Sequence, residues 1–274
     1  MKVLLSIILA ALLFSSCASK FGKILKSKDN EYKLKMAEQY YTAKKYDKAQ
    51  QIFVEVLPYF KGDPRFEDIY YKYAYCAYYL KDYINSENLF KTYTESFPSS
   101  TKAEECEYMR CMSFYKQSPK VDLDQTNTSK TISLMQAFIN THPGSLRIKD
   151  ATQIIDDCRA KLELKEYKAA QLYYNIGTYK AAAVAYTSLI DDYPDSEKSD
   201  TYKLEAIKAY YKYAELSYID KQQERYEKVI SECTDFSERF PDSKLSNEVT
   251  DYKTFSENNI KKIQNEQTSQ TTQR

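Results

Sequence analysis

Few side chains in this chain of 274 residues could do chemistry. His142 is the only histidine, and it lies in a turn before Pro143 rather than beside a nucleophile that it could deprotonate. The six cysteines form no C-x-x-C motif, on which zinc and dithiol sites commonly depend. The four glycines are far apart, so no glycine-rich loop could hold a phosphate. The sequence therefore predicts no catalytic residue, no cofactor and no metal site.

Cys17 is set apart by the residues that precede it. Residues 3–14 follow a basic start and are apolar except for Ser6. A helix of that length is too short for a bilayer core of about 30 Å, but it fits the apolar part of a secretion signal. Small residues then lead to the cysteine in Leu13-Phe14-Ser15-Ser16-Cys17, which resembles a bacterial lipobox. We predict that 1–16 is a lipoprotein signal peptide and that Cys17 is lipidated at the start of a tether, 17–30. The alternative is an ordinary signal peptide with a chance cysteine.

The composition narrows the fold and the partners. Gly and Pro number only 4 and 7, too few for the turns of a sandwich or barrel. The 40 basic and 39 acidic residues are mixed along the chain, so no basic stripe predicts nucleic-acid binding. After removal of the signal, five cysteines besides Cys17 remain, an odd number that cannot all pair within one chain. We expect buried thiols, with a bridge from Cys76 to a neighbour left open.

A repeated pattern of tyrosines predicts helices. Tyr46, Tyr83, Tyr179 and Tyr226 are each followed by a small or aliphatic residue at +3 and, in most cases, by an aromatic residue at +7, which is one face of a helix. Three of these tyrosines stand fifteen residues before a proline, which cannot continue a helix. The repeat ends are Phe97-Pro98-Ser99-Ser100, His142-Pro143-Gly144-Ser145, Tyr193-Pro194-Asp195-Ser196 and Phe240-Pro241-Asp242-Ser243.

An earlier helix precedes each of these helices, with a small residue where the two would approach closely. The small residues are Ala37, Ala74, Cys111 and Ala170. A unit of helix, short turn and helix resembles the tetratricopeptide repeat (TPR). The glycine usual before the second helix appears only as Gly177, with Lys44 and Lys81 in its place.

The predicted fold is therefore all-α, a TPR-like helix-turn-helix solenoid. We count five repeats, at about 31–64, 65–99, 100–145, 146–196 and 197–243, followed by a capping helix at about 244–263. The predicted organisation is N-terminal TPR units at 31–116, an insertion loop at 117–130, C-terminal TPR units with the capping helix at 131–263, and a disordered tail at 264–274. In the insertion we expect Asn127 or Thr128 to cap the next helix.

Aromatic residues on the first helices form a candidate peptide-binding groove. First helices line the concave face of such solenoids, and amphipathic rings suit the recognition of extended peptides. The alternative is that these rings only pack the solenoid. The candidates are Tyr41, Tyr71, Tyr75, Tyr78, Tyr108, Met112 and Tyr115.

Four segments, together with the lipobox and the repeats, carry a resemblance to the BamD family, the TPR-containing lipoproteins of outer-membrane β-barrel assembly, and to its Bacteroidetes-type members in particular. The segments are Phe21-Gly22-Lys23-Ile24-Leu25-Lys26-Ser27, Tyr73-Ala74-Tyr75-Cys76, Ser118-Pro119 with Leu123-Asp124-Gln125-Thr126-Asn127-Thr128, and Glu224-Arg225-Tyr226.

The resemblance implies a lipid-anchored, periplasm-facing protein of the outer membrane. It implies binding to a BamA-like barrel subunit, to unfolded outer-membrane proteins and to other assembly lipoproteins. In the family the N-terminal repeats are associated with substrate and the C-terminal repeats with the barrel subunit. Because no arginine lies between Arg159 and Arg225, we expect Lys168 or Lys180, with Tyr174, to make the partner contact.

The sequence-based hypothesis is thus a non-enzymatic scaffold of the barrel assembly machinery. Two alternatives remain open: a TPR lipoprotein for cell-wall synthesis or glycan capture, and a periplasmic chaperone.

Overall fold

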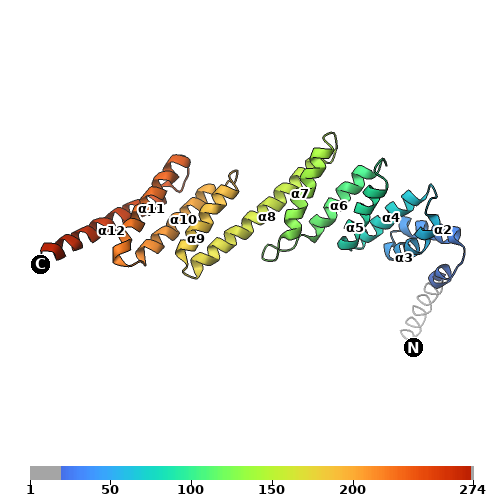
Figure 1. Cartoon of the computed structure of the whole chain (residues 1–274), viewed down its shortest axis with the longest axis horizontal. Coiled ribbons are helices and arrows are strands. Elements are labelled where there is room, and N and C mark those ends of the chain that lie inside the picture. Colours follow the sequence, from blue (N-terminus) through green and yellow to red (C-terminus); the bar gives the residue numbers. More distant parts are fainter. Residues whose placement is uncertain (1–19, 273–274) are drawn as a thin grey trace, which may run out of the picture. The chain divides into compact units, whose positions relative to one another are not determined.

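The structure is a computed structural model that describes residues 20–272, and every regular element in that range is helical (Figure 1). The predicted all-α fold, with five helix pairs and a capping helix, is confirmed. In the first half of the chain, consecutive helices run in opposite directions and form hairpins (Figure 1). The elements are α2 (Asn30–Thr42), α3 (Tyr46–Val56), a short 3₁₀ helix (Leu57–Phe60), α4 (Phe66–Tyr79), α5 (Tyr83–Ser96), α6 (Ala103–Gln117), α7 (Thr126–Thr141), α8 (Ile148–Asn175), α9 (Tyr179–Asp192), α10 (Ser199–Glu215), α11 (Ile219–Arg239) and α12 (Ser246–Thr272).

The chain divides into two compact units, and the division falls between Cys158 and Arg159, inside α8. In unit 1 each helix from α2 to α7 packs on its neighbour in sequence. In unit 2 the same holds from α9 to α12. Each unit has its own buried clusters.

The positions at which the sequence predicts helices to pack are all buried. Ala37, Ala74, Cys111 and Ala170 on the first helices are all buried. So are the +3 residues of the second helices, which are Ala49, Ser86, Ala182 and Val229. A small side chain lets two helix backbones approach closely. A larger residue at these positions would therefore lower the stability of the fold.

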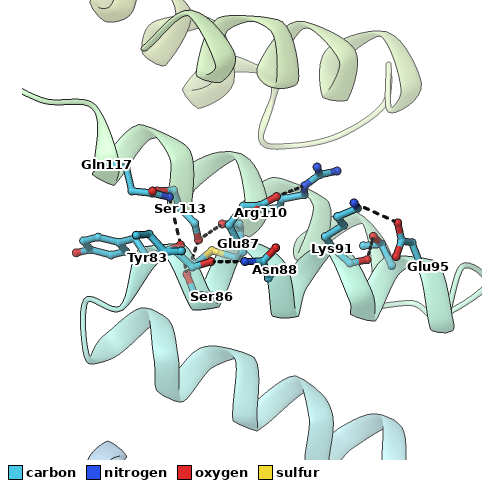
Figure 2. A network of polar contacts seen from close by, with 12 residues as sticks. Tyr83, Ser86, Glu87, Asn88, Lys91, Glu95, Arg110, Ser113 and Gln117 are labelled. Atoms are coloured by element: carbon cyan, nitrogen blue, oxygen red, sulfur yellow. Dashed lines mark hydrogen bonds and ion pairs between the residues drawn. The ribbon is translucent and has the colours of Figure 1, made fainter. Parts of the chain in front are cut away.

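Figure 2 shows how one pair meets the next, at the contact of α5 with α6. The hydroxyls of Ser86 and Ser113 lie 2.7 Å apart in the buried contact, and Ser113 donates to the carbonyl of Met109 at 2.9 Å. At the edge of this contact Arg110 Nε pairs with Glu87 at 2.9 Å. Both serine hydroxyls have hydrogen-bond partners, so their burial does not leave an unsatisfied polar group that would destabilise the fold.

The turns inside the repeats need a left-handed residue. Gly177 has φ +81°, and Lys44 and Lys81 have φ +56° and +63° at the equivalent places. The substitution of lysine for the usual glycine, read from the sequence, therefore leaves the turn conformation unchanged. It places two side chains in a region that costs L-residues about 1 kcal/mol or more.

The repeats also end alike. Phe97, His142, Tyr193 and Phe240 follow the second helices, with φ between −121° and −132° and ψ between 57° and 64°. His142 thus occupies the same structural position as three aromatic residues, and its ring packs on Phe138 with centroids 5.0 Å apart. His142 Nε2 also lies 2.6 Å from a carboxylate oxygen of Glu107 on α6, the first helix of the same pair.

A serine after each of these positions ties the end of a pair to its first helix. Each hydroxyl accepts from the backbone N–H two residues later, at 3.0 to 3.2 Å, and donates to a carboxylate of the first helix, at 2.5 to 2.6 Å. The hydrogen bonds from Ser100 and Tyr93 lower the pKa of Glu67, so this acceptor stays ionised. The four pairs are Ser100–Glu67, Ser145–Glu104, Ser196–Glu163 and Ser243–Asp200.

The insertion is shorter than predicted. We expected a loop at 117–130, but α6 continues to Gln117 and α7 begins at Thr126. Asn127 and Thr128 lie inside the first turn of α7 rather than capping it. Gln125 closes the loop instead: its amide donates to the carbonyls of Lys120 and Leu123 at 2.8 and 3.0 Å, and its oxygen accepts from Thr128 at 2.6 Å.

The predicted tether and the predicted disordered tail both contain helix. Residues 20–25 of the expected tether are helical, and Ile24 is fully buried. At the other end α12 continues to Thr272, through most of the predicted disordered tail of 264–274. No Pro or Gly follows Pro241, so no residue there ends a helix whose earlier turns are fixed by the packing of Ile263.

Replacing the left-handed lysines by glycine is predicted to stabilise the protein. Lys44→Gly and Lys81→Gly should each raise the free energy of unfolding by about 0.5–1 kcal/mol, because the removed steric cost exceeds the added entropy of the unfolded chain. Lys91→Gly within α5 is the matched control and should lower it by about 1 kcal/mol. Guanidinium unfolding followed by circular dichroism measures the stability of all three variants. A loss of stability in Lys81→Gly equal to that in Lys91→Gly would contradict a steric cost of the left-handed conformation at Lys81.

Candidate functional site

The predicted groove residues divide by burial. Tyr75 and Tyr108 are only 6% and 7% exposed and belong to the core of unit 1. The Tyr75 hydroxyl donates to Glu105, and the Tyr108 ring lies under the Arg147 guanidinium at 4.9 Å. These two rings pack the structure and cannot present a face to a peptide, so the packing alternative holds for them.

The other predicted residues are half-buried against the same core. These are Tyr41, Tyr71, Tyr78, Met112 and Tyr115. Burial raises the pKa of Tyr71 and of Tyr78 to about 12, so both hydroxyls stay protonated donors at any physiological pH. Lys102 lies 4.6 Å from the Tyr71 ring centroid, and Tyr115 donates to Asp157 at 3.4 Å.

Two tyrosines outside the predicted set, Tyr46 and Tyr79, contact members of it. Tyr79 is 46% exposed and stacks on Tyr46 with centroids 4.4 Å apart. Tyr79 also contacts Tyr75 at 5.6 Å and Tyr78 at 6.1 Å, and Tyr46 contacts Tyr41 at 5.7 Å. Periodicity counted from the first helix alone missed Tyr79, although its place beside Tyr78 at the helix end marks it as more exposed. We call Tyr41, Tyr46, Tyr71, Tyr78 and Tyr79 the tyrosine surface of unit 1.

Unit 2 contains a groove along α9. It has a volume of about 690 Å³, and Gly177 forms the turn at one end of it. Its lining is mostly apolar or aromatic, so it suits a side chain with little charge. The lining residues are Tyr173, Gly177, Thr178, Tyr179, Lys180, Ala181, Val184, Ala185 and Tyr213.

The groove continues into a cationic end of about 370 Å³, which shares Lys180, Val184 and Tyr213 with it. The Arg225 guanidinium stacks on the Tyr213 ring at 4.0 Å and also donates to Ser217. The remaining residues that line this end are Tyr210, Lys221, Glu224 and Lys228. Lys228 pairs with Glu232 at 2.5 Å, whereas no ion pair of Lys180 or Lys221 occurs among residues 20–272. We call the two parts together the unit 2 groove.

The three residues predicted for the partner contact are not equivalent. Lys180 lines both parts of the unit 2 groove. Tyr174 is half-buried, with its ring 5.1 Å from that of Tyr179, and belongs to the core of unit 2. Lys168 is exposed on α8 and lines neither part of the groove. The structure adds Arg225, which the sequence had marked only through the segment Glu224-Arg225-Tyr226.

The cysteines and the possible metal ligands are the other groups that could do chemistry. Cys17 lies outside the described residues. Cys76, Cys106, Cys111 and Cys233 are buried, and burial raises the pKa of each thiol to about 12. Within the part of the chain that the structure describes, no group of His, Cys, Asp or Glu side chains is placed to hold a metal ion. In that same part, none of the helices has both the length and the apolar character needed to cross a bilayer.

Comparison with known proteins gives the family. The sequence model of the YfiO family, described as outer membrane lipoprotein, matches residues 27–202. The chain belongs to this family. The predicted membership of the BamD family is thereby confirmed, since YfiO-family proteins are BamD-like outer membrane lipoproteins. The protein is thus an outer-membrane assembly lipoprotein with helical repeats.

Two known proteins resemble this chain over much of its length. A protein of Aquifex aeolicus (strain VF5), named as an outer membrane protein assembly factor BamD, is 24% identical over 206 residues, which cover 74% of this chain and 67% of that protein. Among solved structures, the complex of the TPR2AB domain of yeast Sti1 with pHSP90 matches with a TM-score of 0.38 and 12% identity, over 83% of this chain and 98% of the other.

The burial of the rings predicts which tyrosines carry stability. Tyr75→Ala should lower the free energy of unfolding by about 3 kcal/mol, because it leaves a cavity in the core and removes the hydrogen bond to Glu105. Tyr79→Ala should lower it by roughly 1 kcal/mol or less, because its ring is about half exposed. Denaturant unfolding of both variants measures the difference. Equal losses would contradict the division into core rings and surface rings.

Proposed function

We propose that the protein is a non-enzymatic scaffold, anchored in the outer membrane through lipid on Cys17 and facing the periplasm. Unit 2 binds the barrel subunit of the assembly machinery, and unit 1 binds segments of unfolded outer-membrane proteins. The single observation that carries the proposal is the unit 2 groove, in which an apolar channel leads to a cluster of cations in a member of the YfiO family.

The chemistry of the unit 2 groove supports a folded protein partner with acidic groups. Lys180 and Lys221 supply positive charge that no ion pair offsets in residues 20–272, and Arg225 is held in place by the Tyr213 ring. Charge complementarity at an interface gives specificity and fast association. Val184, which is 51% exposed, and the aromatic rings beside it supply the apolar centre that a stable contact needs.

The tyrosine surface of unit 1 supports binding of extended chains. Tyr79 and its neighbours offer ring faces together with hydroxyl donors, which can contact both apolar side chains and peptide groups. An unfolded outer-membrane protein alternates apolar and polar residues along its strands, so it presents both kinds of contact. Such a surface binds by summed contact area rather than through one reactive group.

The rival functions make different use of the same surfaces. Glycan capture also uses exposed aromatic rings, but it gives no role to the cations of the unit 2 groove. A soluble periplasmic chaperone needs no anchor, and release of the protein by Cys17→Ala would show that the anchor exists.

Charge reversal in the unit 2 groove is predicted to release the barrel subunit. Lys180→Glu combined with Lys221→Glu should reduce the amount of barrel protein that co-purifies with the anchored protein by roughly tenfold, since two exposed charge contacts are worth about 1.4 kcal/mol together and reversal adds repulsion. The matched control, Lys149→Glu with Lys244→Glu, changes two exposed lysines outside the groove and should leave co-purification unchanged.

Mass spectrometry of the proteins that co-purify from detergent-solubilised membranes measures the effect. The function is refuted if no barrel protein with periplasmic domains co-purifies with the unmodified chain. The site is refuted if such a protein is captured but both double variants retain it equally.

A further inference from the structure

The first described residues carry a dense positive charge. Lys20, Lys23, Lys26 and Lys28 lie within nine residues that contain no acidic side chain, and all four are exposed. No ion pair involving any of the four occurs in residues 20–272. Their charge is therefore not neutralised by the fold.

These lysines are held by the core and do not lie on a free tether. The helix at 20–25 inserts Ile24, which is fully buried, into the cluster formed by α2 and α3. Phe21 packs edge-on against Tyr40 with centroids 5.8 Å apart, and Leu25 lies against the same cluster. The apolar residues of this turn thus face the body of unit 1, while Lys20 and Lys23 stay exposed to solvent.

The connection to α2 is also hydrogen-bonded. Lys26 N–H donates to the carbonyl of Gly22 at 3.2 Å, and Ser27 N–H donates to that of Ile24 at 3.1 Å. Asp29 accepts from Tyr32 N–H at 2.9 Å and caps α2. Lys48 of α3 adds a cation next to this helix, with its ammonium 5.6 Å from the Phe21 ring centroid. The positive surface therefore has a fixed position relative to the first repeat.

The proposed anchor point lies close to this surface. Only three peptide links separate Cys17 from Lys20, which is at most about 11 Å of extended chain. An acyl anchor and a nearby basic patch act on the same membrane, so their contributions to binding add. This step rests on the proposed acylation of Cys17.

We propose that Lys20, Lys23, Lys26 and Lys28 form a docking surface for a bilayer that contains anionic phospholipid. The lysine surface lies on the headgroups of the membrane in which the lipid is inserted. Because Ile24 fixes the helix to the core, the contact between the lysines and the headgroups sets the orientation of unit 1 at the membrane.

Vesicle binding without the lipid tests the surface directly. The mature chain, 17–274, carrying Cys17→Ser keeps every described residue and cannot be acylated. It should bind vesicles of phosphatidylglycerol and phosphatidylethanolamine at low salt, release them as NaCl is added, and bind phosphatidylcholine vesicles at least tenfold more weakly. Each lysine near an anionic surface contributes about fivefold to the partition coefficient. Replacing all four by Gln should therefore lower it more than about a hundredfold.

A matched control separates the surface from net charge. Lys149→Gln, Lys244→Gln, Lys261→Gln and Lys262→Gln remove the same charge from exposed positions elsewhere, and they should leave the partition coefficient within about threefold. Circular dichroism checks folding; if the first quadruple variant does not fold, the pairs Lys20→Gln with Lys23→Gln and Lys26→Gln with Lys28→Gln should each lower binding about 25-fold.

Equal binding of the unmodified and the Lys20/23/26/28 variant overturns the inference, and so does an equal loss in the control. Binding to phosphatidylcholine as tight as to anionic vesicles also overturns it. None of these results bears on the proposed function, because acylation of Cys17 and capture of barrel proteins are measured separately.

Discussion

The close approach of two helices at a small residue is the constraint on which this protein depends. Ala37, Ala74, Cys111 and Ala170 on the first helices are all buried, so only a small side chain occupies each of these core positions. The pair is then closed at its far end by a serine that bonds a carboxylate of the first helix, as Ser100 does with Glu67. These contacts lie within one helix pair, so each pair can form before the next is added, as expected for repeat proteins.

The small buried residues and the serine–carboxylate hydrogen bonds occupy only a few positions in each pair. The exposed faces of the helices can therefore differ from pair to pair. Unit 1 presents tyrosines, unit 2 presents an apolar groove with a cationic end, and residues 20–28 present lysines. A scaffold gains from this arrangement, since chemically different partners can bind one chain without a change of fold. The single histidine illustrates the same point, because His142 occupies the repeat-end position that aromatic rings fill in the other pairs.

The repeats were predictable because their signal is periodic. Spacing alone placed the small residues, the helix-ending prolines and the lysines that replace glycine. It failed where the outcome depends on which neighbour covers a residue. Tyr75 and Tyr79 have the same chemistry, yet one is buried and the other about half exposed. Ile24 and the end of α12 were missed because short or polar segments carry little periodicity. The acidic partners of the repeat-end serines were missed because they lie 33 to 43 residues away.

Site-specific photo-crosslinking in growing cells tests the central claim, that the two units contact different proteins, most directly. A photoreactive amino acid at position 180 samples the unit 2 groove, and one at position 79 samples the tyrosine surface of unit 1. We predict that position 180 crosslinks to one abundant barrel subunit. Position 79 should crosslink to a range of outer-membrane proteins that disappears when their synthesis is stopped. Crosslinking of both positions to the same protein, or of position 79 to glycan alone, would contradict the account.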